Sequence, residues 1–216
     1  MGDVIHGHLF VISGPSGTGK GAICSGLAAS TDAMLSVSMT TRAPRDHEED
    51  GRDYFFVEKG QFEEVIAGDG FLEYAEVFGE YYGTQKAPAV KELDKGRDVI
   101  LEIDVDGAMQ VRDCMPDAVL VFIMPPSADE LRKRIEGRGT ETSENIARRL
   151  ARADSEIAKV GEYDYCVVNS DLEKAIGEVL AIVNAEKQSE ENECVEKLRV
   201  GADAEKIIKR YQTGNY

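Results

Sequence analysis

The sequence predicts an α/β fold with a mainly parallel sheet and helices on both of its faces. Short apolar runs alternate along the chain with segments whose apolar residues recur at helical spacing, and this alternation is typical of strand–helix–strand units. Residues 119–124 form a continuous apolar run, which is the mark of a parallel strand buried on both faces. A glycine-rich turn joins the first expected strand, residues 8–13, to the first expected helix, residues 22–29.

This turn, residues 14–21, reads Gly-Pro-Ser-Gly-Thr-Gly-Lys-Gly. Glycines let backbone N–H groups approach an anion closely, and the N-terminus of the following helix adds a partial positive charge. Lys20 stands where a lysine in such a turn reaches the terminal phosphates of a nucleotide. The turn therefore predicts a phosphate-binding site.

Two other interpretations of the turn stay open at this point. The P-loop pattern expects Ser or Thr after the lysine as a magnesium ligand, whereas Gly21 and Ala22 follow here. Residues 17–22 also fit the looser dinucleotide fingerprint, which requires an acidic residue about 20 positions later. Residues 37–42 hold no acid, although Arg42 offers a guanidinium for a 2′-phosphate. An ordinary glycine-rich strand–helix turn is the remaining alternative.

The length, charge and cysteine content of the chain disfavour several classes of protein. The chain has 216 residues and a formal net charge of −16, so it suits one α/β domain with insertions or two small domains. It lacks the basic character of a general nucleic-acid binder. Its four cysteines are not at metal-ligand spacing, which favours a reducing compartment. No apolar run approaches the 18 residues of a membrane span and the N-terminus lacks signal-peptide features, so we expect a soluble cytoplasmic protein without a membrane partner.

A second short strand is expected over residues 33–37, and a basic loop follows it. Arg42 and Arg45 flank a proline in this loop, and guanidinium groups bind phosphate oxygens bidentately. The loop is therefore either an anion clamp or a solvated loop with unrelated charges. Residues 46–53 then form an acidic loop that we expect to be exposed.

Residues 38–86 are rich in predicted strands and are interpreted as an inserted lobe. Strands are expected at 54–57, 71–77 and 80–84, and a helix at 61–67. Such a β-rich segment interrupts the helix–strand alternation of the rest of the chain.

The alternation resumes with a helix over residues 87–95 and a central strand over residues 98–104. Side chains alternate along a strand, so Glu102 and Asp104 are expected to point the same way. Ligands of open α/β sheets bind at the carboxyl ends of the strands. The two acids are therefore expected to face the phosphates or their metal, the alternative being two solvent-facing acids.

A basic helical segment follows the strand at 119–124. A Gly-Arg-Gly turn around Arg138 leads to a helix from residue 143 that carries Arg148, Arg149 and Arg152. Glycines that flank an arginine between two helices suggest a lid that swings a charge over a transferring phosphoryl group. The alternative is a solvated helical hairpin.

The last strand is expected at residues 165–169 and the closing helix at 171–187. Residues 188–216 form an acidic extension in which no chemistry is recognised. We interpret it as a solvated extension or as a helix that packs on a partner chain. The oligomeric state, monomer or homo-oligomer, stays open.

Taken together and in this order, these stretches resemble the guanylate kinase family over residues 8–187. The segments that carry the resemblance are 14–21, Ser38 with 40–45, 51–56, 71–75, 81–84, Ile103 and Asp104 with Gly107, and Arg134 with 137–140. The resemblance implies a P-loop nucleoside monophosphate kinase fold that transfers the γ-phosphoryl group of ATP to GMP, with Mg²⁺ accompanying ATP. The parts it implies are a core (1–37 and 87–187), a GMP-binding lobe (38–86), a helical lid (132–149) and the acidic extension (188–216).

The resemblance also implies roles for individual residues. The ATP-binding residues are Gly14, Pro15, Ser16, Gly17, Thr18, Gly19, Lys20, Gly21 and Asn169. The GMP-binding residues are Ser38, Arg42, Arg45, Tyr54, Glu73, Tyr82, Thr84 and Asp104. The catalytic residues are Lys20, Arg42, Arg138 and Arg149, with Arg134 as a further candidate. Water and phosphate oxygens are expected to supply most magnesium ligands, and Glu102 is the candidate protein ligand.

The chemistry of guanine supports the implied GMP site. Guanine presents N1–H and N2–H donors beside the O6 acceptor, so the Glu73 carboxylate can accept from the donors while a hydroxyl of Ser38 or Thr84 serves O6. Adenine presents the opposite pattern and would leave a buried group unpaired. A kinase for another base is therefore disfavoured. A non-catalytic guanylate-kinase-like interaction module is disfavoured because Lys20, Arg42, Arg45 and Arg138 are all present.

Overall fold

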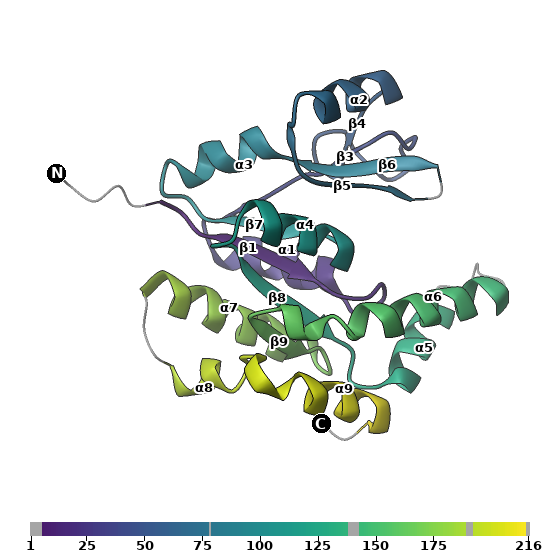
Figure 1. Ribbon diagram of the computed structural model, residues 1–216, viewed down its shortest axis with the longest axis vertical. Coiled ribbons are helices and arrows are strands. Elements are labelled where there is room, and N and C mark those ends of the chain that lie inside the picture. Colours follow the sequence, from purple (N-terminus) through teal and green to yellow (C-terminus); the bar gives the residue numbers. More distant parts are fainter. Residues whose placement is uncertain (1–5, 78, 138–142, 189–191, 215–216) are drawn as a thin grey trace.

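In the computed structural model, residues 6–77, 79–137, 143–188 and 192–214 are described. A five-stranded parallel sheet forms the centre of the molecule (Figure 1). Its strands, in spatial order, are β2 (Met34–Leu35), β7 (Val99–Glu102), β1 (Leu9–Ser13), β8 (Val119–Met124) and β9 (Tyr165–Val168). The predicted parallel α/β sheet is confirmed. The strand over 98–104 was expected at the centre, but β1 lies there and β7 lies beside it.

Alternation along the strands divides the core into two layers. In β1, Phe10 and Ile12 face α1 (Lys20–Ser30) and α7 (Leu172–Gln188), whereas Leu9 and Val11 face the opposite layer. That opposite layer contains α4 (Val105–Cys114) and α3 (Lys86–Leu93). Helices on both faces bury β1 and β8 completely, which explains why these two strands are apolar along nearly their whole length.

The predicted inserted lobe contains a second sheet, which lies above the first in Figure 1. Its strands, in spatial order, are β4 (Phe55–Phe56), β3 (Met39–Thr40), β6 (Glu80–Gln85) and β5 (Phe71–Val77). One helix, α2 (Lys59–Ala67), covers it. Phe62 of α2 is fully buried and stacks on Phe71 at 4.4 Å and on Tyr81 at 5.2 Å between ring centroids. Aromatic packing of this kind gives the small sheet a core of its own.

Two further helices project from the carboxyl end of the parallel sheet. Ser127 caps α5 (Ala128–Glu136) by accepting the backbone N–H of Glu130 at 3.1 Å. Leu131 and Ile135 of α5 pack against the following helix, α6 (Ser143–Ile157). Of the expected Gly-Arg-Gly turn between these helices, Gly137 ends α5, whereas Arg138 and Gly139 lie outside the described residues.

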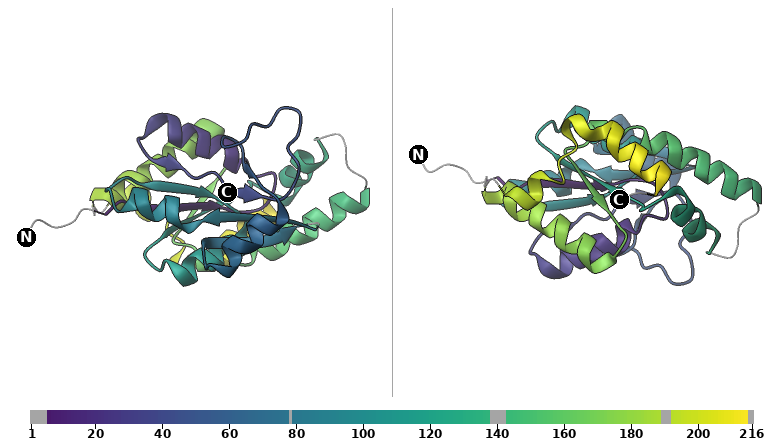
Figure 2. Two further views of the ribbon diagram at one scale, coloured as in Figure 1. Left: turned by 90° about the horizontal axis from the view of Figure 1, so that it is seen from above. Right: turned by 90° about the horizontal axis from the view of Figure 1, so that it is seen from below.

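The C-terminal segment folds back onto the rest of the chain. It contains α8 (Glu193–Glu196), the 3₁₀ turn η2 (Gly201–Asp203) and α9 (Ala204–Thr213). The N–H of Cys166 donates to Leu198 O at 2.8 Å, and the N–H of Val200 donates to Asp164 O at 3.0 Å. The segment thus pairs with the open edge of β9, and Figure 2 shows it crossing that edge.

The prediction of a solvated or partner-bound extension is therefore wrong for residues 192–214. Val195 is buried in the layer of α1 and α7, whereas Val200 and Tyr211 are buried in the opposite layer. The segment passes around the edge strand β9 and buries apolar side chains on both sides of the sheet. Three apolar side chains spread over some seventeen positions make a weak sequence signal, and the unpaired edge that they cover is a property of the folded sheet.

Cys24, Cys114, Cys166 and Cys194 are all unpaired thiols. Among the described helices, none is both long enough and apolar enough to cross a membrane.

Replacing Tyr211 with alanine is expected to destabilise the protein. The side chain is 3% exposed, and truncating a buried aromatic residue costs about 3–5 kcal/mol. Urea unfolding followed by circular dichroism measures the loss. Leu172→Ala, at a side chain that is 39% exposed, is the control and should cost under about 1 kcal/mol. Equal effects of the two substitutions would show that the C-terminal segment is not part of the cooperative core.

Candidate active site

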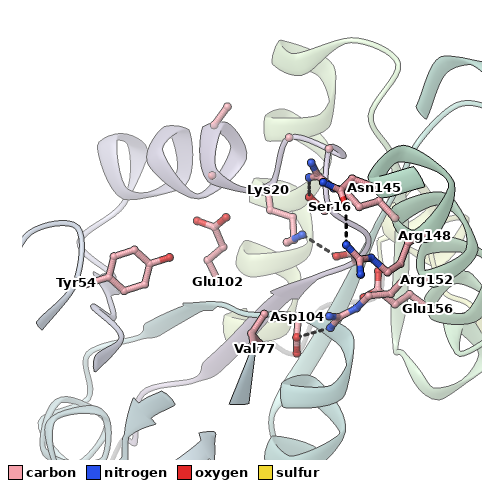
Figure 3. A pocket seen from close by; sticks show the side chains of 16 residues that line it. Ser16, Lys20, Tyr54, Val77, Glu102, Asp104, Asn145, Arg148, Arg152 and Glu156 are labelled. Atoms are coloured by element: carbon pink, nitrogen blue, oxygen red, sulfur yellow. Dashed lines mark hydrogen bonds and ion pairs between the residues drawn. The ribbon is translucent and has the colours of Figure 1, made fainter. Parts of the chain in front are cut away.

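A cleft of about 1260 Å³ opens at the carboxyl end of the parallel sheet (Figure 3). The glycine-rich turn and the end of β7 line one side, and α6 lines another. Tyr54 and Val77 reach it from the second sheet. The cleft therefore brings together three parts of the chain that are distant in sequence.

The turn between β1 and α1 has the geometry that its glycines predict. Gly14 has a φ of 136°, and a Cβ there would lie 2.4 Å from the carbonyl oxygen of Ile123. Only glycine fits such a close approach to a neighbouring strand. The Thr18 hydroxyl donates to Pro15 O at 2.9 Å and closes the turn from within.

Lys20, the first residue of α1, curls over this turn. Its Nζ donates to Gly14 O at 2.6 Å and to Pro15 O at 3.1 Å. Burial lowers the pKa of Lys20, and the negative charges of Glu102 and Glu156 oppose that shift. The ammonium group is therefore held at the mouth of the turn by backbone oxygens, with carboxylates beside it.

Asn169, which follows β9, stabilises the turn through its side-chain amide. Its Nδ2 donates to Thr18 O at 2.7 Å, and a Cβ at Gly19 would lie 2.5 Å from the same nitrogen. The backbone oxygen of Asn169 in turn accepts from Arg134 Nη2 at 3.0 Å. The structure thus places Asn169 against the turn and Arg134 against Asn169, both outside the lining of the cleft.

The two acids at the end of β7 both line the cleft, but not for the predicted reason. The strand ends at Glu102, and Asp104 is the N-cap of α4, where its Oδ1 accepts the Gly107 N–H at 2.8 Å. The expectation that both lie on one strand face is therefore wrong. Glu102 is solvent-exposed within the cleft, yet partial burial raises its pKa while Lys20 opposes the rise.

Arginines of α6 face the turn across the cleft. Arg149 Nη2 donates to the Ser16 hydroxyl at 2.6 Å, so the second lid helix contacts the turn directly. Arg152 Nη2 donates to Asp104 Oδ2 at 2.9 Å. Arg138, the other lid arginine that was predicted to be catalytic, lies outside the described residues.

A second cationic cluster lies on the loop before β4. Arg42 pairs with the Glu48 carboxylate at 2.9 Å, and its Nε donates to the Tyr82 hydroxyl at 3.2 Å. Its guanidinium lies 5.5 Å from the ring centre of Tyr54. Arg45 contacts the same carboxylate, with its Nη1 3.8 Å from Glu48 Oε1. Four residues predicted to bind one anion are thus gathered around Arg42 and Glu48.

Sequence reasoning missed Glu48, which belongs to the loop expected to be only an exposed acidic segment. Hydrogen bonds from Arg42 and from the backbone of Arg45 lower the pKa of Glu48 to about 2. An acid three positions after a predicted anion-binding arginine was the available signal. Glu156 was also missed, because the residues around it in the sequence do not distinguish it from a solvent-exposed acid on a helix.

The predicted base-recognition residues form one hydrogen-bonded chain. The Thr84 hydroxyl donates to Glu73 Oε1 at 2.6 Å, and the Ser38 hydroxyl lies 3.4 Å from that of Thr84. Glu73 is only 7% exposed. Burial raises its pKa to about 7, and the Thr84 hydrogen bond opposes the rise. A Cβ at Gly107 would lie 2.8 Å from Glu73 Oε2, so α4 makes room for this carboxylate.

Comparison with known proteins identifies the family. The guanylate kinase family model matches residues 6–186. The chain belongs to the guanylate kinase family. Its members are nucleoside monophosphate kinases, a class of transferase, and the family resemblance predicted from the sequence is confirmed.

Individual guanylate kinases match over most of the chain. The guanylate kinase of Clostridium acetobutylicum is 48% identical over 181 residues, which is 84% of this chain and 87% of that protein. That of Thermus thermophilus is 47% identical over 184 residues, 85% of this chain and 84% of that protein. The crystal structure of guanylate kinase from Anaplasma phagocytophilum is 35% identical, with a TM-score of 0.71 over 88% of this chain and 89% of that one. The likeness confirms the P-loop nucleoside monophosphate kinase fold.

In this guanylate kinase family member, Glu73 should make stability fall as pH rises. The folded-state pKa of about 7 lies above the ordinary value of 4.5, so the folded protein favours the protonated carboxyl. The stabilising contribution is therefore complete below about pH 4.5 and is lost as pH rises towards 7. Glu73→Gln, which cannot ionise, should gain on the order of 2 kcal/mol relative to wild type between about pH 5 and pH 8.

Urea unfolding at the two pH values measures this difference. Glu76→Gln, on the same strand at an exposed position, is the matched control and should show no such pH-dependent gain. A constant difference between Glu73→Gln and wild type at both pH values would contradict the raised pKa.

Proposed function

We propose that this chain transfers the γ-phosphoryl group of ATP to GMP, giving ADP and GDP. The observation that carries the proposal is that a P-loop lysine and lid arginines line the cleft, while the lobe that borders it holds the buried, hydrogen-bonded carboxylate of Glu73. The first set suits a triphosphate, and the second suits a base with paired N–H donors. The core (1–37 and 87–187), lobe (38–86) and lid (132–149) are proposed as the working parts.

The turn and the lid supply the charge that phosphoryl transfer requires. Backbone N–H groups of the turn and the N-terminus of α1 suit the phosphates of ATP. Lys20, at the mouth of the turn, neutralises the terminal phosphates. Arg149 already reaches Ser16 of the turn at 2.6 Å, a position from which it stabilises charge on the transferred group. No covalent intermediate is needed, because positioning and electrostatics lower the barrier.

The cluster around Arg42 suits the phosphate of GMP. Arg42 and Arg45 supply guanidinium groups, and Tyr54 and Tyr82 supply phenolic hydroxyls. Glu48 holds Arg42 in place through its 2.9 Å ion pair. A guanidinium that is already oriented loses less conformational entropy when the phosphate binds.

The Glu73 chain suits guanine. When ionised, the Glu73 carboxylate accepts hydrogen bonds from the N1–H and N2–H of the base. Thr84 donates a further hydrogen bond to that carboxylate, and the Ser38 hydroxyl can donate to O6 of guanine. Adenine would bring no paired donors to a buried carboxylate, and an unpaired buried charge is costly. Asp104 is a second acceptor at the cleft wall.

The residues present fit a magnesium ion bound with ATP. Glu102 Oε1 lies 3.4 Å from the position that a Cβ at Gly21 would occupy, where the hydroxyl-bearing side chain of a P-loop would begin. Among the described residues, none is hydrogen-bonded to the Glu102 carboxylate. Its oxygens are therefore available to coordinate a hard cation or to bind the water molecules around that cation. Glu102 would hold the ion, and when bound the ion neutralises charge on the β- and γ-phosphates.

Nucleotide substrates and unpaired cysteines together support a cytoplasmic location.

A coupled assay for ADP production tests the proposed function. With ATP and magnesium, GMP should be turned over, and AMP, CMP and UMP should be slower by about 10³-fold or more. Lys20→Met should lower kcat by about 10²–10³-fold, because one charged donor to the transferred group is lost. Lys91→Met, at an exposed position on α3, is the control. Binding of GMP without turnover would favour the non-catalytic interaction module.

The KM for GMP should fall as pH rises from 6 to 8. The ionised fraction of Glu73, with a pKa of about 7, rises from about one-tenth to about nine-tenths over this range, so we expect the KM for GMP to fall roughly ninefold. The GMP phosphate also titrates near pH 6, and Glu73→Gln isolates that contribution because the amide cannot ionise. An equal pH dependence in wild type and Glu73→Gln would contradict a role for the Glu73 charge.

A further inference from the structure

Arg152 joins two carboxylates at the wall of the cleft. Figure 3 shows its guanidinium reaching Asp104 from the lid helix. Its Nη2 donates to Asp104 Oδ2 at 2.9 Å, and its Nε donates to Glu156 Oε1, one turn along α6, at 2.8 Å. A planar guanidinium with donors on two edges makes both bonds at once, which a lysine ammonium does with less directional control.

These contacts determine how Asp104 presents its oxygens. Asp104 Oδ1 accepts the Gly107 N–H at 2.8 Å, and Arg152 occupies one lone pair of Oδ2. The two anchors lie on different elements, so the carboxylate cannot rotate. A carboxylate has about four acceptor positions, so two remain for donors in the cleft.

A neighbouring acid could compete for Arg152, but a lysine holds it. Asp106 Oδ2 lies 3.8 Å from Arg152 Nη2, beyond hydrogen-bond distance. Asp106 Oδ1 accepts from Lys159 Nζ at 2.7 Å. Lys159 thus neutralises Asp106, and Arg152 keeps its hydrogen bond to Asp104.

Stability alone is a weak reason for the contact between Arg152 and Asp104. Their side chains are 46% and 35% exposed, and ion pairs at such exposure contribute little to folding because solvent screens them. The pair with Glu156 differs, because that side chain is only 9% exposed and its charge needs a partner. The electrostatic surroundings give a stronger reason. Glu102, Asp104 and Glu156 all act on Lys20, so three acids crowd a cleft suited to anionic nucleotides, and Arg152 neutralises part of that charge.

We propose that Arg152 is a positioning residue for GMP, acting through Asp104 by holding that carboxylate in the orientation in which it accepts from the base. The inference rests on the proposed function, because it takes GMP as the ligand of the cleft. Arg152 makes no contact with the transferred group in this scheme. Its removal therefore weakens GMP binding in the ground state and the transition state alike, which raises KM without lowering kcat.

The test is steady-state kinetics and calorimetric GMP binding on four variants of the full chain. They are Arg152→Met, Arg152→Lys, Asp104→Asn and the double substitution of Arg152→Met with Asp104→Asn. Arg152→Met should raise the KM and Kd for GMP by about tenfold, the scale of one charge-assisted hydrogen bond. The KM for ATP and kcat should stay within about twofold of wild type. Arg152→Lys keeps the charge beside Glu156, so it should fold normally and recover most of the GMP affinity.

The double substitution decides whether Arg152 acts through Asp104. In the Asp104→Asn background, Arg152→Met should raise the KM for GMP no further. A full tenfold loss in that background, or a loss in kcat and ATP affinity with unchanged GMP affinity, would overturn the inference. Arg210→Met, at an exposed position of α9 outside the cleft and the lid, is the control for removing an arginine. Absence of GMP turnover in the wild type would refute the proposed function, separately from these comparisons.

Discussion

The close approach of the glycine-rich turn to β8 is the constraint on which the rest of the site depends. Gly14 passes so near the carbonyl of Ile123 that a Cβ would lie 2.4 Å from its oxygen. The turn starts from β1, the middle strand of the sheet, which is hydrogen-bonded to a neighbour on each side. Because both its start and its packing are fixed, the turn determines where α1 begins and where Lys20 stands. Glu102, Asn169 and Arg149 then meet it from three other elements.

Local ion pairing lets an acidic protein present cations to anionic ligands. The chain carries 41 acidic and 25 basic residues, so a guanidinium on it is surrounded by competing carboxylates. In the cleft Asp104 orients Arg152, and beside it Glu48 orients Arg42. Each pair keeps a guanidinium in one place, and a bound phosphate or base then meets a preorganised group.

The two sheets are joined beside Glu73, the residue that is proposed to bind the base. Gln110 of α4 uses both ends of its amide on the backbone of Tyr74, accepting its N–H at 3.2 Å and donating to its carbonyl at 3.1 Å. This places a side chain from the core along the edge of β5, next to Glu73. Gly107, one turn earlier on α4, leaves the space that the Glu73 carboxylate occupies. The position of the buried carboxylate is therefore set by the core and the lobe together.

The sequence by itself determined the strand–helix order, the glycine-rich turn and the separate β-rich segment, because apolar periodicity and glycine spacing are local signals. Its motifs also identified the family and predicted Lys20, Arg42 and Glu73 as site residues, since each lies in a short pattern. Only the tertiary structure decided that Asp104 caps α4, that Glu48 pairs with Arg42, and that residues 192–214 cover the edge of β9. Those outcomes depend on which groups meet across long sequence separations, and neither an unpaired sheet edge nor a buried ion pair exists until the chain has folded.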